Sequence, residues 1–232
     1  MFFDKNMARI IFNFGLFKVK FTLNKNLRIN GSDNEIIVYD SAGKRVEKSD
    51  ALKHFKININ GNGNRIEIFE NQNYSNNSIT INGNENQVKI NSSNEIIQNL
   101  NVWMFNCANN RKVEIGSNFC CGAVTLYVLE DSEEVRIGSN VLMSDTIAIR
   151  TSDGHQIIDI ESNEIINKSN GPILIGDNCW IARHVDIFKN SQIPNNTIVA
   201  CDTLVNKKFT EEYTVLGGYP AQVLKRGVTW KK

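Results

Sequence analysis

The chain has 232 residues, a formal net charge of +1 and 41% hydrophobic residues. This length can bury a full core in one or two domains, and the near-neutral charge gives no indication of a nucleic-acid partner. The five cysteines form no CxxC pair, which argues against a disulfide framework and a structural zinc site and indicates a reducing compartment. We therefore expect a cytoplasmic protein without a bound metal, with association with the inner face of the membrane as the alternative.

The first strand pattern covers residues 17–23, where apolar and polar side chains alternate. The apolar stretch around it is interrupted by lysine and glycine, so we predict no transmembrane segment, and the opening residues lack the pattern of a signal peptide. Residues 1–56 precede the regular repeats. We predict that they form an N-terminal cap, because a solenoid needs to cover its last open edge.

A short phrase of two branched aliphatic residues followed by a turn recurs from residue 57 onward. Its copies begin at Ile57, Ile79, Val113, Val135 and Ile173. Each ends in asparagine and glycine or serine residues that form turns and tolerate a positive φ angle. The irregular intervals predict coils of a solenoid with loops inserted between some of them. The dense asparagines between 56 and 100 predict stacked turns that hydrogen-bond between coils.

The period becomes strict from residue 175. Branched aliphatic residues stand every six positions, at Ile175, Ile181, Ile187, Ile193, Val199 and Val205. Small or β-branched residues follow four positions after the first five, at Cys179, Val185, Ser191, Thr197 and Thr203. A six-residue period fits neither an α-helix nor a hairpin, but it fits a triangular coil with one hexad on each side. We predict an all-β protein with a parallel β-helix over 57–205 and a short C-terminal extension over 206–232.

The regular pattern stops at His155, six residues after Ile149, and we predict a loop at about 155–172. Function concentrates in loops held by a rigid scaffold. Histidine is a natural general base because its ordinary pKa is about 6.5. His155 is therefore the candidate base, whereas His54 precedes the repeats without a motif and His184 is expected to point outward at the surface.

The run GPILIGDNCWIARHVDIFKNSQIPNNTIVACDTLVNK and the later GGYPAQVLK resemble the hexapeptide-repeat acyltransferases, over about residues 110–228. The segment from Ile149 to Asp159 resembles more narrowly the O-acetyltransferases of capsular and other surface polysaccharides, including the polysialic acid enzymes. The resemblance implies a left-handed β-helix and a homotrimer that binds acetyl-CoA in the groove between neighbouring helices. It also implies acetyl transfer to a carbohydrate hydroxyl and places His155 at the position of the catalytic histidine.

The same resemblance gives Trp180 a role in catalysis and acetyl-CoA binding. The alternative is that Trp180 packs against a neighbouring subunit, and both can hold at once. The small side chains of Ala182 and Ala200 would let the main chain approach the cofactor. Cations near the C-terminal end of the groove suit the phosphate groups of CoA. The remaining cofactor-binding candidates are Lys207, Lys208, Gly218 and Lys225.

Nearness to His155 in the chain makes Asp145, Arg150 and Asp153 candidate contacts for the acceptor. Asp153 can also orient the imidazole, although Asp in a Ser-Asp-Gly sequence is more often a turn former. Cys179 could carry an acyl group, but it occupies a small core position, so we expect it to fill the core.

Two alternatives to a polysaccharide O-acetyltransferase remain. One is an N-acetyltransferase that acts on a nucleotide-linked amino sugar with the same base and cofactor. The other is a non-catalytic β-helix that binds or supports other molecules, which predicts no affinity for CoA and leaves His155, Trp180 and the Gly-x-Pro-Ala ending unexplained.

Overall fold

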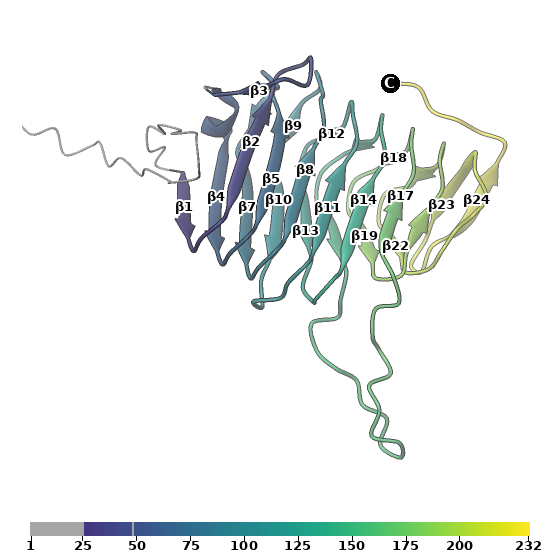
Figure 1. The fold of residues 1–232 in the computed structure, drawn as a ribbon. Coiled ribbons are helices and arrows are strands. Elements are labelled where there is room, and N and C mark those ends of the chain that lie inside the picture. Colours follow the sequence, from purple (N-terminus) through teal and green to yellow (C-terminus); the bar gives the residue numbers. More distant parts are fainter. Residues whose placement is uncertain (1–25, 48) are drawn as a thin grey trace, which may run out of the picture.

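A computed structural model of the protein describes residues 26–47 and 49–232. These residues form a three-sided parallel β-helix built from three eight-stranded sheets, and Figure 1 shows its coils stacked along one axis. The predicted all-β parallel β-helix is confirmed. The strand expected at 17–23 lies outside the described residues.

In the middle of the β-helix each sheet takes one strand from each coil. Sheet 1 contains, in spatial order, β1 (Leu27–Asn30), β4 (Phe55–Asn60), β7 (Asn77–Asn82), β10 (Leu100–Met104), β13 (Val124–Tyr127), β16 (Ile147–Arg150), β19 (Val185–Phe188) and β22 (Thr203–Val205). Sheet 2 contains β3 (Arg45–Val46), β2 (Glu35–Tyr39), β5 (Arg65–Phe69), β8 (Gln87–Ile90), β11 (Lys112–Ile115), β14 (Glu134–Ile137), β17 (Ile173–Ile175) and β20 (Gln192–Ile193). Sheet 3 contains β6 (Tyr74–Ser75), β9 (Ile97–Gln98), β12 (Cys120–Cys121), β15 (Leu142–Met143), β18 (Trp180–Ile181), β21 (Ile198–Val199), β23 (Thr214–Gly217) and β24 (Gln222–Arg226). Antiparallel pairs, β2 with β3 and β23 with β24, lie at one edge of sheet 2 and of sheet 3.

The β-helix begins earlier than the predicted boundary at residue 57. Leu27 and Ile29 of β1 pair in parallel with Ile57 and Ile59 of β4, so β1 already belongs to sheet 1. In sheet 2, β3 pairs antiparallel with β2 and forms the edge of the sheet, and the short 3₁₀ helix η1 (Ala51–His54) then leads into β4. That residues 1–56 cap the β-helix stays a prediction, although β1 within this range is already a strand of sheet 1.

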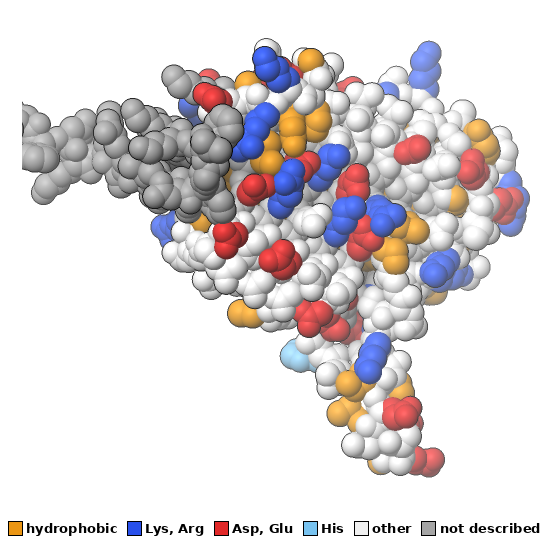
Figure 2. Space-filling model, in the orientation of Figure 1, with side chains coloured by type: hydrophobic (Ala, Val, Ile, Leu, Met, Phe, Trp, Pro, Cys, Tyr) orange, Lys and Arg blue, Asp and Glu red, His pale blue; other side chains and the backbone are white. Residues whose placement is uncertain are grey.

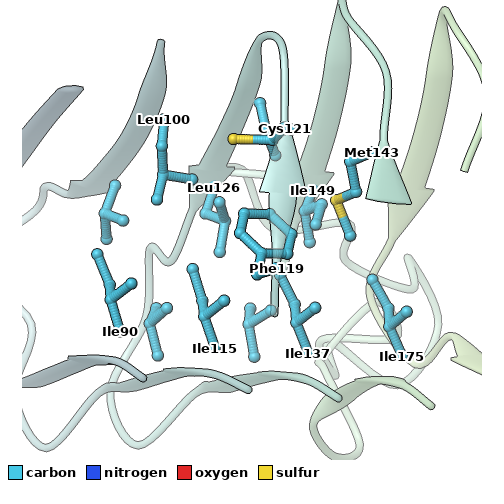
Figure 3. Close-up of a cluster of buried hydrophobic side chains, with 14 of the residues drawn as sticks. Ile90, Leu100, Ile115, Phe119, Cys121, Leu126, Ile137, Met143, Ile149 and Ile175 are labelled. Atoms are coloured by element: carbon cyan, nitrogen blue, oxygen red, sulfur yellow. The ribbon is translucent and has the colours of Figure 1, made fainter. Parts of the chain in front are cut away.

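The core is a set of aliphatic rows that run along the helix axis. Successive strands pair in register, so that Ile115 lies beside Ile137 and Ile137 beside Ile175. Figure 3 shows this row facing Leu126 and Ile149 across the interior. The predicted hexad residues are all buried, including the small corner residues that follow them. Along each strand, the branched aliphatic residues of the repeat point inward and are buried, and the residues between them point outward.

The irregular intervals of the repeated phrase have two different causes. The copies at Ile57 and Ile79 lie on sheet 1, whereas those at Val113, Val135 and Ile173 lie on sheet 2. The long step from Ile79 to Val113 is thus a change of face rather than an inserted loop. The long step from Val135 to Ile173 does contain an inserted loop, over residues 151–172.

Asparagines at one corner form the predicted ladder between coils. Asn64 donates through Nδ2 to Asn34 Oδ1 at 3.0 Å, and Asn86 donates in the same way to Asn64 at 3.0 Å. The next coil places Arg111 in this position, fully buried, and its Nε donates to Asn86 Oδ1 at 2.9 Å. Its other guanidinium nitrogens donate to main-chain oxygens, including that of Val128 at 3.0 Å. Burial lowers the pKa of Arg111 to about 10.

The glycine of the repeated phrase is required by the closeness of the coils. Gly61 has a φ of +146°, and a Cβ atom there would lie 1.9 Å from the carbonyl oxygen of Gly83 in the next coil. No side chain fits such a gap.

Candidate active site

The inserted loop at residues 151–172 projects from the β-helix between β16 and β17 (Figure 1). It begins four residues before His155, and Ile158 and Ile165 form an antiparallel bridge within it. Asn167 crosses the loop and donates through Nδ2 to the main-chain oxygen of His155 at 2.9 Å. The main chain at His155 is thereby fixed while its side chain is exposed.

Asp153 holds the loop to the next coil. Its carboxylate forms an ion pair with Lys189, and its Oδ2 accepts a 2.7 Å hydrogen bond from Asn167 Nδ2. These bonds hold the pKa of Asp153 below its usual range, the bond from Lys189 contributing most. The carboxylate is thus engaged by Lys189 and Asn167 rather than by the imidazole, which supports a scaffold role for Asp153 instead of an orienting one. Arg150, the last residue of β16 before the loop, lies over the Tyr127 ring, with 5.0 Å from its Cζ to the ring centroid.

A cleft of about 310 Å³ lies beside His155. One wall is the turn at residues 130–134, and the other contains His155, Gln156 and Asn167 of the loop. Figure 2 shows acidic side chains gathered where the loop leaves the body.

Glu133 lines this cleft, with only 9% of its surface exposed. Its Oε2 accepts hydrogen bonds from the main-chain N–H groups of Leu129 and Glu130, at 3.0 and 2.9 Å, and from the hydroxyl of Thr151. Its Oε1 is buried without a partner. Burial raises the pKa of Glu133.

Trp180 lies on sheet 3, and its side chain points outward as predicted, with 37% of the residue exposed. It belongs to an outward-facing row formed by paired residues of adjacent strands: Cys120, Leu142, Trp180, Ile198 and Val215. The ring of Trp230 approaches it, with 6.4 Å between centroids. Cys179, the preceding residue, is fully buried, and burial raises the pKa of its thiol to about 12, in agreement with a core role.

The two predicted alanines lie at the corner between sheets 3 and 1, which we call the alanine corner (residues 144–146, 182–184 and 200–202). The main-chain N–H groups of Ala182 and Ala200 bond to the next coil along, at 2.9 Å to Val199 and 2.8 Å to Leu216. Asp145 also lies at this corner, 3.3 Å from the Nε of Arg183. Asp145 is therefore at a different corner from the loop of His155, despite its nearness in the sequence.

The predicted cations are likewise divided between the corner that carries the loop and the end of sheet 3. Lys207 and Lys208 follow β22, at the corner that carries the loop, and Lys207 lies over the Phe209 ring at 5.3 Å. Gly218 directly follows β23, with a φ of +106°, and its oxygen accepts a bond from the main-chain N–H of Leu204, which follows the alanine corner. Lys225 pairs with Val215 at the end of sheet 3.

Within one chain, the predicted site residues therefore form two separate groups. The loop group contains Arg150, Asp153, His155, Lys207 and Lys208. The sheet 3 group contains Asp145, Trp180, Ala182, Ala200, Gly218 and Lys225. Sheet 1 lies between them. Sequence reasoning missed Trp230, for which no repeat or spacing gave a signal.

The part of the chain that the structure describes shows no grouping of three or more His, Cys, Asp or Glu side chains that could hold a metal ion. Among the same residues, no helix has the length and apolar character needed to cross a membrane.

No protein-family model matches the chain. A 121-residue segment, 52% of the chain, is 31% identical to the polysialic acid O-acetyltransferase of Escherichia coli O1:K1, of which it covers 38%. A 118-residue segment, 49% of the chain, is 30% identical to the galactoside O-acetyltransferase of Escherichia coli K12, of which it covers 53%. The matches thus span only about a third to half of these relatives.

The solved structure of the polysialic-acid-specific acetyltransferase NeuO extends this likeness to most of the chain. It superposes with a TM-score of 0.72 at 25% identity, over 88% of this chain and 81% of that one. In sequence and in fold the chain is thus similar to the hexapeptide-repeat acyltransferases. The left-handed β-helix expected from the resemblance to this family is thereby confirmed.

Proposed function

We propose that the protein is an acetyl-CoA-dependent O-acetyltransferase that modifies a hydroxyl of a sugar in a cell-surface or capsular polysaccharide. The observation that carries this proposal is His155, exposed beside a cleft on a loop that Asn167 braces internally and Lys189 holds to the next coil of the β-helix. The names of two relatives, a polysialic acid and a galactoside O-acetyltransferase, support the reaction and the class of acceptor.

In this proposal, His155 acts as a general base in a direct transfer. A bound acetyl-CoA supplies an acetyl group that is already activated as a thioester. The imidazole of His155 takes the proton of the acceptor hydroxyl as that oxygen forms its bond to the acetyl carbon, and returns it to the sulfur as the carbon–sulfur bond breaks. No acyl-enzyme is needed, in keeping with the burial of Cys179.

The sheet 3 group fits acetyl-CoA. Trp180 offers an exposed ring in an apolar row, and the small side chains of Ala182 and Ala200 leave the main chain at the alanine corner accessible. Lys225 adds a cation at the end of the same sheet.

We propose a homotrimer, because sheet 1 separates the two groups within one chain. A neighbouring copy that packs against this sheet would bring its Trp180 group toward the His155 loop. The mass in solution tests this directly: three copies of a 26.2 kDa chain are expected by light scattering.

The function is tested by two measurements on the purified protein. Acetyl-CoA should raise the melting temperature, since a ligand at 100 times its dissociation constant stabilises by about 2.7 kcal/mol. Acetyl transfer should then occur to a hydroxyl-bearing polysaccharide and not to a UDP-linked amino sugar. The opposite preference would make the protein an N-acetyltransferase, and the absence of any thermal shift would indicate a non-catalytic β-helix.

A further inference from the structure

Residues 228–232, which we call the strap, run back across the coils after β24. The main-chain N–H of Val228 bonds to the oxygen of Tyr213 at 3.0 Å, and Nε1 of Trp230 donates to the oxygen of Asn178 at 2.8 Å. Lys232 forms an ion pair with Glu95. These partners precede β23, β18 and β9, so the strap runs along the corner that leads into sheet 3, past the ends of its strands (Figure 1).

The reach of the strap agrees with these contacts. Five inter-strand steps separate β23 from β9 in sheet 3, a distance of about 24 Å. Five extended residues span about 17 Å, and the long side chain of Lys232 covers the remainder. The strap is thus nearly fully extended, so one of its contacts cannot shift far while the others are kept.

The strap lies beside the outward row of sheet 3 that contains Trp180. The rings of Trp230 and Trp180 are tilted by 43° with centroids 6.4 Å apart, a separation typical of interacting aromatic pairs. A second cleft, of about 270 Å³, lies between the strap and the coils, and its lining includes Leu142, Asn140, Trp230 and Lys231. The apolar row, the second indole and the cleft therefore form one continuous surface.

The charges of the strap add to this surface. Lys231 and Lys232 line the cleft, and among the described residues Lys231 has no ion-pair partner. Lys207 and Lys208 lie at the loop corner instead, across sheet 1 from the alanine corner. Of the earlier candidate cations, only Lys225 lies on sheet 3, at its far end, and the strap adds Lys231 and Lys232 beside the cleft that Trp230 lines.

We propose that the strap is part of the acetyl-CoA site, with Trp230 extending the aromatic surface of Trp180 and Lys231 binding a phosphate group of CoA. This inference rests on the proposed function. A thioester with a long, mostly uncharged arm and an anionic nucleotide end suits an apolar row that is bordered by an indole and a lysine. Trp230 would position the cofactor and take no part in the chemical step.

The test measures acetyl-CoA binding by calorimetry and by tryptophan fluorescence, together with kcat and KM, for Trp230→Ala, Trp230→Phe and Lys231→Ala. We expect Trp230→Ala to raise Kd and KM about tenfold with kcat unchanged, whereas Trp230→Phe retains most of the affinity. Lys231→Ala should weaken binding of CoA more than binding of a pantetheine thioester without the nucleotide. The control is Lys44→Ala, an exposed lysine in the turn before β3.

Each other outcome has a clear meaning. Wild-type protein that binds no acetyl-CoA would overturn the proposed function itself. Wild-type protein that binds while Trp230→Ala and Lys231→Ala bind equally well would overturn only the role of the strap. A loss of assembly in Trp230→Ala, with Lys231→Ala binding normally, would show that the strap covers a subunit interface instead.

Discussion

Arg111 occupies the position in its coil that Asn86 and Asn64 occupy in theirs, and its Nε donates to Asn86 Oδ1 at 2.9 Å. An arginine thus ends an asparagine ladder by satisfying several main-chain oxygens at once. Arg111→Ala should lower the free energy of unfolding by about 3 kcal/mol, because these buried acceptors lose their donors. Urea denaturation measures this loss. The matched control is Arg136→Ala, an exposed arginine paired with Glu134, which should cost less than about 1 kcal/mol; similar losses would contradict a special role for Arg111.

Two glycines with positive φ separate the effect of backbone conformation from the effect of crowding. A Cβ at Gly61 would lie 1.9 Å from a main-chain oxygen, whereas a Cβ at Gly43, with a φ of +79°, would meet nothing within 4 Å. Gly61→Ala should therefore cost more than about 2 kcal/mol, and Gly43→Ala about 1 kcal/mol. Thermal unfolding of the two variants gives the comparison. Equal shifts in melting temperature would mean that the coils can move apart at Gly61.

Removal of the proposed base should abolish turnover without affecting the scaffold. His155→Ala is expected to reduce kcat by at least about 10², because the side chain is exposed and only its main chain takes part in the loop contacts. Steady-state kinetics, binding of acetyl-CoA and the mass in solution are measured together. His54→Ala serves as the control histidine. If kcat remains near the wild-type value, His155 is not the base.

Mixed assemblies test whether the site is shared between copies. His155→Ala and Trp180→Ala should each be nearly inactive alone. If neighbouring copies supply the two groups, a refolded equimolar mixture should regain about a quarter of wild-type activity, since random assembly creates intact pairs at that frequency. A mixture that stays inactive would mean that both groups act within one chain, whereas Trp180→Ala that is fully active alone would mean that Trp180 has no role in turnover.

The buried carboxyl of Glu133 makes stability depend on pH in a definite direction. Burial raises its pKa above the ordinary 4.5, so above that pH the native state binds more protons than the unfolded state. Stability contributed at this site therefore falls as pH rises from 4.5 through the native pKa. Glu133→Gln keeps an acceptor for the N–H groups of Leu129 and Glu130, so it should be more stable than wild type at pH 7, with a difference that shrinks in acid. Urea denaturation across this range checks it, and a difference that does not change with pH would contradict it.

The sequence alone was sufficient to predict the three-sided coil, because each inward Ile or Val recurs at a period that only this geometry satisfies. It was also sufficient to place the loop and the outward Trp180. It could not show which face a repeated phrase occupies, since the copies on sheets 1 and 2 have the same pattern. The start of the β-helix at Leu27 was missed because the first coil carries only a weaker copy of the phrase and is followed by the β2–β3 hairpin.

The candidate site was less predictable because distance along the chain is a poor guide to distance in a β-helix. Asp145 is ten residues from His155 yet lies at another corner. Trp230 is far from Trp180 in the sequence but approaches its ring, because the chain reverses after β24 and crosses the coils. Contacts of this kind depend on the path of a segment without repeats, which no periodicity encodes.

The register across the inserted loop has a consequence for how such proteins can diversify. Val135 pairs with Ile173 and Ile137 with Ile175, as in coils that have no insertion. The loop inserted at that corner therefore does not change the register of the coils on either side of it. Under the proposed function, changes in the length or composition of this loop would alter which acceptor is recognised and leave the stacked coils that carry His155 unchanged.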